Sequence, residues 1–199
     1  MVSGNDSREK LIALLQLAYS GELAAAHAYR GHWHSVRQTV QRESIRKIED
    51  DEWRHRKLVG EMLAGLGAGP SKRREIRAAI IGRTLGLLCH ITGWLAPMYG
   101  AGKLESRNVR EYETAARYAR DCGCVGLIDC LLEMAEVEWD HEFYFRSRVM
   151  EHALGRRLPL WTQPPPKETI RISLAREKVA SSLQEDSPLI ELGHEQTHA

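Results

Sequence analysis

The sequence predicts an all-α fold, a four-helix bundle with one extra apolar helix between its two helical hairpins. Apolar residues recur at helical spacing over four long stretches, which are separated by short breaks in the pattern. The motif Glu-Trp-x-His also occurs twice, with Glu52 and His55 in one copy and Glu138 and His141 in the other. Residues three apart lie on one face of an α-helix, so each copy directs a carboxylate and an imidazole the same way.

A chain of 199 residues with 43% apolar and 28% charged residues is typical of one globular domain with an extension. Its formal net charge of +1 gives no sign of nucleic-acid binding, which usually accompanies a strong basic excess. The four cysteines form no Cys-x-x-Cys pair, so neither a zinc ribbon nor a rubredoxin-type iron site is expected. The first ten residues lack the apolar region of a signal peptide, so we expect a cytoplasmic protein.

The first two helices are expected over about residues 7–36 and 39–66. Glu22 lies within the apolar stripe of the first helix, where an unpaired carboxylate would cost several kcal/mol, so a positive partner or a hydrogen-bonded core position is expected. Glu52 and His55 lie within the inner stripe of the second helix. Residues 49–51 are acidic, and we expect their side chains to turn outward as a solvated face.

Residues 71–103 begin with basic residues and are then apolar from 78 to 102. Three interpretations are open: a buried or oligomer-facing helix, a surface that docks on a membrane, and a membrane-spanning helix. Gly82, Gly86, Gly93 and Pro97 interrupt the segment and disfavour a span. The preceding basic residues favour docking over spanning.

A further helix is expected from about Glu105 to Asp121, and it contains two candidate inward acids. Glu111 is bordered by apolar side chains, whereas Glu113 lies beside an arginine stripe that is typical of a solvated face. Glu111 is therefore preferred as the inward acid, with Glu113 as the alternative. The last helix of the bundle, over about 127–154, carries the second Glu-Trp-x-His motif on its apolar face.

Residues 1–155 are thus expected to form the bundle, and 156–199 a proline-containing linker and a polar tail that is partly disordered or packed on the bundle. The tail contains two more Glu-x-x-His pairs, which overlap in His-Glu-Gln-Thr-His at 194–198. This pattern resembles a zinc-protease motif. Only one residue follows it, however, so we interpret it at most as an adventitious metal-binding tail.

In the bundle, each motif belongs to a hairpin whose other arm carries a lone inward acid. Four carboxylates and two imidazoles carry a charge of −4, which matches two divalent cations and would be repulsive without them. Ligands of these two kinds suit iron, and manganese is possible. The candidate ligands are Glu22, Glu52, His55, Glu111 (or Glu113), Glu138 and His141.

Parts of the sequence resemble a known family. Residues 21–31, Gly-Glu-x-x-Ala-x-x-x-Tyr-x-Gly, and the Glu-x-x-His of 52–55 followed by Glu-Met-Leu at 61–63 resemble the first two ligand helices of the demethoxyubiquinone hydroxylase family. That family belongs to the ferritin-like di-iron carboxylate superfamily and is related to rubrerythrin. The apolar stretch at 78–102 resembles its hydrophobic segment for membrane and quinone access. The resemblance covers most of residues 10–150.

The resemblance implies a ferritin-like bundle with two iron ions as the cofactor and the six ligands given above. Aligning the sequence on Tyr118 selects Glu111 as the ligand from its helix, whereas a rubrerythrin-style alignment selects Glu113. Tyr29 and Tyr118 each follow an acid by seven residues, so they are expected one layer from the metals, as hydrogen-bond or redox partners or as packed core tyrosines.

The first functional hypothesis is a di-iron monooxygenase that uses O₂ to hydroxylate a small hydrophobic, quinone-like substrate. The alternatives are a rubrerythrin-like peroxidase or oxidase and a non-catalytic metal-storage or structural bundle. The chain shows no glycine-rich nucleotide-binding motif, so an external electron donor or reductase is expected. Peripheral membrane contact through 78–102 and homo-oligomerisation are both compatible with this hypothesis.

Overall fold

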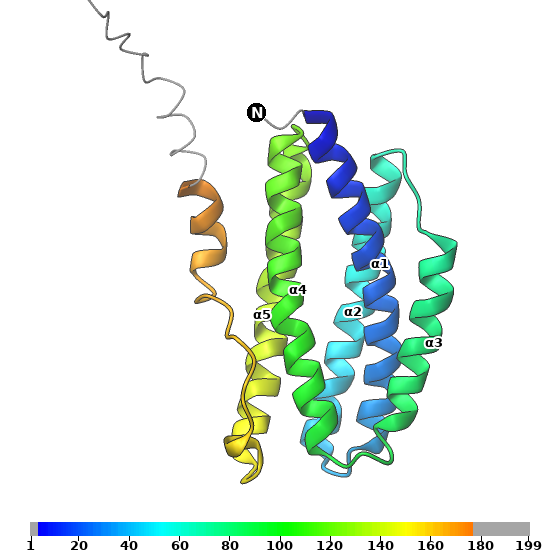
Figure 1. The fold of residues 1–199 in the computed structure, drawn as a ribbon, viewed down its shortest axis with the longest axis vertical. Helices are drawn as coiled ribbons and strands as arrows, with labels where there is room; N and C mark the ends of the chain where they lie inside the picture. Colours follow the sequence, from blue (N-terminus) through cyan, green and yellow to red (C-terminus); the bar gives the residue numbers. More distant parts are fainter. Residues whose placement is uncertain (1–3, 177–199) are drawn as a thin grey trace, which may run out of the picture.

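The protein is all-helical in the computed structural model, which describes residues 4–176, and no strand occurs in that part of the chain. Figure 1 shows the helices running side by side along the long axis of the molecule. The bounds of the helices are α1 Gly4–Ser35, α2 Thr39–Gly65, α3 Lys72–Leu88, α4 Leu95–Asp121 and α5 Ile128–Glu151, with short 3₁₀ turns at Val125–Leu127 and Gly155–Arg157.

The apolar faces of α1, α2, α4 and α5 meet in one core. Leu11 and Leu15 of α1, Leu63 of α2, Ala116 of α4 and Leu131 of α5 are all fully buried in the same cluster. The helix α3 lies outside this group and packs against α1 (Figure 1). The expected bundle with an extra helix between two hairpins is therefore confirmed at the level of an all-α helical bundle.

The apolar segment at 78–102 is divided between two helices and a turn. The helix α3 ends at Leu88, residues 89–94 form a turn in which Gly93 has φ +76°, and α4 begins at Leu95. The expected start of this helix at about Glu105 was therefore ten residues too late. Only α1, among the residues described, is long and apolar enough to cross a membrane, and this helix also contributes Leu11 and Leu15 to the core.

Glycines allow α3 and α1 to pack so closely that their backbone atoms are in contact. A Cβ atom on Gly82 would lie 2.3 Å from the carbonyl oxygen of Ala24, and one on Gly31 would lie 2.3 Å from the Cα of Gly86. Any larger residue at these positions would force the two helices apart. The helix α3 exposes large apolar side chains: Ile76, Ile80, Ile81, Leu85 and Leu87.

The segment after α5 runs back along the α4–α5 side of the bundle (Figure 1). The Trp161 indole donates a hydrogen bond to Glu142, at 2.6 Å between Nε1 and Oε1, and the Ser106 hydroxyl of α4 donates to the Thr162 carbonyl at 2.7 Å. Ile170, in a helical turn that begins at 169, is 1% exposed. Residues 160–174 thus pack on the bundle, while the Glu-x-x-His pairs of 191–198 lie outside the described residues.

Candidate metal centre

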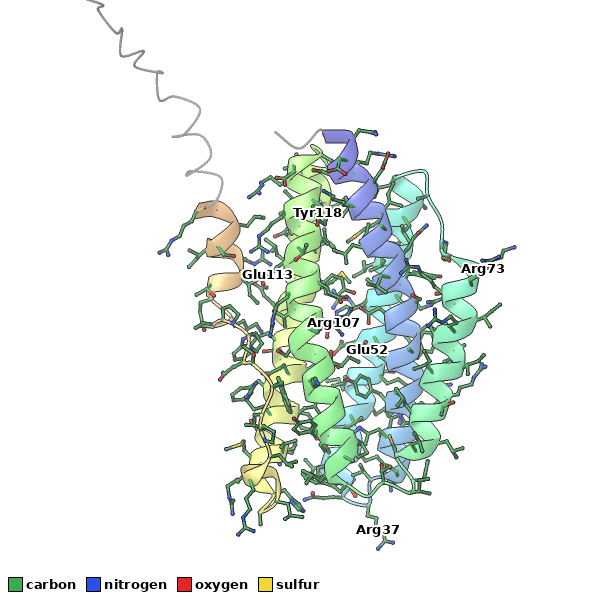
Figure 2. The ribbon with its side chains drawn as sticks, viewed as in Figure 1. Arg37, Glu52, Arg73, Arg107, Glu113 and Tyr118 are labelled. Carbon is green, nitrogen blue, oxygen red and sulfur yellow. The ribbon has the colours of Figure 1, made fainter. Side chains whose placement is uncertain are left out.

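Six buried acids and histidines from four helices meet in the core, and Glu52 is labelled at mid-height in Figure 2. They form two groups that share Glu138, and within each group one ligand atom per residue lies within 4.8 Å of the others. Each of the six is less than 5% exposed. One group is Glu52, Glu105, Glu138 and His141, and the other is Glu22, His55 and Glu138.

The two Glu-Trp-x-His motifs face each other across α2 and α5. His55 Nδ1 lies 2.9 Å from Glu138 Oε1, and His141 Nδ1 lies 3.5 Å from Glu52 Oε1. Each imidazole therefore meets the carboxylate of the opposite motif. The helical spacing places the carboxylate and the imidazole of each motif on the inner face of its helix. Because α2 and α5 face each other, the imidazole of each motif lies beside the carboxylate of the other.

The remaining two acids, Glu22 of α1 and Glu105 of α4, each accept a hydrogen bond from a tyrosine of the other helix. The Tyr112 hydroxyl of α4 donates a hydrogen bond to Glu22 of α1, and the Tyr29 hydroxyl of α1 donates to Glu105 of α4. Tyr29 thus adjoins the cluster, where the sequence led us to expect it. Tyr118 instead is half-buried against the apolar core, and Tyr112 occupies the position next to an acid.

The structure places Glu105 in the cluster in the position expected for Glu111 or Glu113. Glu111 is half-buried and accepts a hydrogen bond from Arg107 Nε at 2.6 Å, and, like Glu113, it belongs to neither buried group. Because α4 begins at Leu95, Glu105 lies ten residues into the helix and not at its first turn. The spacing of an acid seven residues before a tyrosine occurs twice in α4, and the inward copy is the first.

Asp51 supports His141 from outside the cluster. Its Oδ2 lies 3.2 Å from His141 Nε2, which leaves Nδ1 of the same ring facing the carboxylates. A carboxylate on the outer nitrogen of a ligand histidine fixes the ring orientation and its tautomer. The expectation that residues 49–51 form a solvated face is wrong for Glu49 as well, because it is 4% exposed and accepts a hydrogen bond from Trp33 Nε1 at 2.6 Å.

Without a cation, the cluster retains protons. Burial raises the pKa of Glu22 and of Glu105 well above the ordinary value, and the neighbouring carboxylates raise both further. Burial alone would raise the pKa of Glu138 too, but the nearby imidazoles of His141 and His55 hold it below its ordinary value. Burial opposes charge on His141, yet Asp51 and Glu138 raise its pKa well above normal. The site therefore prefers positive charge at its centre.

The donor atoms fit a bound metal. Both carboxylate oxygens of Glu52, Oε2 of Glu22, Oε2 of Glu138 and Nδ1 of His141 are buried and make no hydrogen bond. Such atoms are costly to bury unless a partner satisfies them. A cation between them would supply that partner, and the oxygen and nitrogen donors suit a hard or borderline divalent ion. The cluster could therefore hold a metal ion.

One small cavity reaches the cluster from the α1–α4 side. It has a volume of about 40 Å³, and Glu22 and Tyr112 form part of its wall. Leu104, Asn108 and Glu111 of α4 also line it. A space of this size holds one or two molecules as small as water.

The chain was compared with protein-family models, with curated proteins and with solved structures, and none of the three comparisons found a match.

Proposed function

We propose that this protein is a ferritin-like di-iron oxidoreductase that uses dioxygen to hydroxylate a hydrophobic substrate, with a quinone-like ring as the first candidate. The observation that carries the proposal is the pair of buried ligand groups that share Glu138. Two groups with a common carboxylate are what a bridged pair of cations requires. The four carboxylates would neutralise two divalent ions.

Each residue has a defined role in this proposal. Glu52, Glu105, Glu138 and His141 would hold one ion, and Glu22, His55 and Glu138 would hold the other. Bound iron would supply the redox chemistry that activates dioxygen, and manganese is the alternative metal. The protein's own part is to orient the ligands and to keep water out of the reaction.

The tyrosines and Asp51 would act on the ligands and not on the substrate. The hydroxyls of Tyr29 and Tyr112 each hold one oxygen of an acid, Glu105 and Glu22 respectively. The second oxygen of Glu22 has no hydrogen-bond partner and is available to a metal. Asp51 contacts Nε2 of His141 and so leaves Nδ1 of that ring available to a metal. The contacts of Tyr112 and Asp51 leave Oε2 of Glu22 and Nδ1 of His141 to face the centre.

The small cavity favours a second candidate function, a rubrerythrin-like peroxidase or oxidase. A volume of about 40 Å³ admits dioxygen or hydrogen peroxide but no aromatic ring, because sites for ring-sized ligands are typically several hundred Å³. Hydroxylation would require Leu104, Asn108 and Glu111 to move away from the cavity. A peroxidase would need no such movement.

A hydrophobic substrate also needs a source, and we propose that α3 contacts a membrane surface. The helix exposes large apolar side chains, and Lys72, Arg73 and Arg74 at its start are exposed as well, with Arg73 labelled at the outer edge of Figure 2. This combination suits an anionic lipid surface. Sedimentation with vesicles of anionic lipid tests it, with Ile80→Asp as the variant expected to lose binding. Self-association of the chain in the absence of vesicles would instead assign the face to an oligomer.

Reconstitution with Fe(II) under anaerobic conditions tests the metal centre. We expect about two iron ions per chain, an optical change after exposure to dioxygen, and loss of both in Glu52→Ala and Glu138→Ala. Glu43→Ala is the matched control, because Glu43 lies on an exposed face of α2. One iron or none per chain, unaffected by Glu52→Ala, would show the proposal to be wrong.

The two candidate functions are separated by following the oxygen atoms. The loaded protein is supplied with isotopically labelled dioxygen, a reductase with NADH, and a quinone-like ring compound. A hydroxylase transfers one labelled atom to the ring. A peroxidase consumes hydrogen peroxide and leaves the ring unlabelled.

A further inference from the structure

A pair of cysteine thiols lies at the turn between α4 and α5. Cys122 and Cys124 are separated by Gly123 alone, and their Sγ atoms are 3.3 Å apart. Both side chains are partly exposed. Residues two apart are at most about 7 Å from Cα to Cα, which lies at the upper limit for a disulfide.

The backbone of the turn holds the two thiols on one side. Gly123 has φ +77°, a conformation that favours glycine, and its N–H donates to the Arg120 carbonyl at 3.1 Å. The Cys124 N–H donates to the Ala119 carbonyl at 2.7 Å. The hydrogen-bonded end of α4 therefore fixes the short distance between the two sulfurs. A disulfide bond of about 2.05 Å requires the two Sγ atoms to approach by a little over 1 Å.

The surroundings of Cys124 leave this thiol of the pair open to a small molecule. A hollow of about 550 Å³ lies beside the turn, and Cys124 and Cys130 are in its wall. Burial raises the pKa of the Cys124 thiol, and its hydrogen bond with Cys122 raises it further. Exchange begins at whichever of the two cysteines is present as its thiolate.

We propose that Cys122 and Cys124 form a redox-active dithiol that is oxidised to an intramolecular disulfide by a low-molecular-weight disulfide such as oxidised glutathione. The thiolate of one of the two cysteines attacks one sulfur of that disulfide and releases one thiolate. The other cysteine, after losing its proton, attacks the sulfur of the first and releases the second thiolate. The two electrons of the protein dithiol thus reduce the small disulfide, and the two released thiolates take up the two protons.

The ring that this disulfide closes contains only three residues. Disulfides in strained small rings are reduced more readily than structural disulfides. The oxidation should therefore be reversible in mixtures of oxidised and reduced glutathione. This inference is independent of the metal centre, because neither cysteine belongs to a buried ligand group.

The test uses the full chain, oxidised glutathione and a chelator, with free thiols counted before and after. We expect wild type to lose two of its four thiols and two hydrogen atoms in mass, to retain no glutathione, and to yield a cross-linked peptide containing Cys122 and Cys124. Cys124→Ser should instead keep one glutathione on Cys122. Cys89→Ser and Cys130→Ser are the matched controls and should each still form the disulfide.

Three outcomes would overturn the proposal. Wild type could retain all four thiols, glutathione could accumulate on several cysteines without a cross-link, or the cross-link could include Cys130. The wild-type measurement alone decides the first of these, so a variant that folds poorly does not leave the proposal untested. Circular dichroism of each variant confirms that its helices are intact.

Discussion

Replacing Glu105 by glutamine distinguishes the acid that the structure places in the cluster from the one that the sequence favoured. The Glu105 side chain is fully buried within the group that contains Glu52, Glu138 and His141. Burial and the neighbouring Glu138 raise its pKa well above normal, so a negative charge at this position is unfavourable when no metal is bound, and glutamine removes that charge. We therefore expect the metal-free variant to lose less than about 1 kcal/mol of unfolding free energy.

When metal is bound, wild type and Glu105→Gln should differ strongly in unfolding free energy. Loss of a residue that merely supports a ligand costs about 10–100-fold in metal affinity, so loss of a ligand should cost at least about 100-fold, or about 2.7 kcal/mol. The assay is urea unfolding at a fixed Mn(II) concentration, with the affinity measured by titration. Manganese is used because it avoids oxidation during the experiment.

Glu111→Gln is the matched control on the same helix. It removes an i,i+4 ion pair with Arg107, worth about 0.3–0.5 kcal/mol, and should leave the metal-dependent stabilisation unchanged. If Glu105→Gln retains the wild-type affinity, or if Glu111→Gln loses as much as Glu105→Gln, the assignment of Glu105 is refuted.

Three further predictions concern the site's support and the packing around it. Asp51→Asn should weaken Mn(II) binding by about 10–100-fold and leave the number of ions bound unchanged, as measured by titration. Gly31→Ala should destabilise the protein by about 1–3 kcal/mol in urea, because its Cβ would meet the backbone of α3, whereas Gly21→Ala, with open space around it, should not. Burial lowers the pKa of His32 to about 4. Unfolded His32 then binds a proton below about pH 6.5 and folded His32 does not, so stability is lost as pH falls from about 6.5 to about 4, by up to about 3 kcal/mol. His32→Phe should show a smaller loss over that range, and an identical pH profile would contradict this.

The parts of the site that follow from local patterns could be predicted from the sequence. Glu52 and His55 lie three residues apart within one helix, and Glu22 lies in the centre of an apolar stripe, so each could be assigned inward from its own helix alone. The structure brings these residues together with the second motif. The prediction of an all-α bundle rests on the same helical periodicity.

The parts that depend on distant contacts or on helix limits could not be predicted. The inward position of Glu105 depends on where α4 begins, and the apolar composition of 78–102 does not reveal the turn around Gly93. The contact between Asp51 and His141 joins residues 90 apart in the sequence, and the local charge pattern gives no sign of it. Three consecutive acids at 49–51 have the composition of a solvated face, and only the packing of α2 shows which of them are buried.

The two tyrosine–glutamate hydrogen bonds between α1 and α4 have a consequence for how the chain folds. Neither the α1–α2 hairpin nor the α4–α5 hairpin supplies the hydroxyl that its own buried acid requires, because Tyr112 serves Glu22 and Tyr29 serves Glu105. A hairpin that formed alone would leave its buried acid without the tyrosine hydroxyl in an apolar environment. The two halves should therefore gain their stability together, and the bundle should unfold in a single cooperative transition.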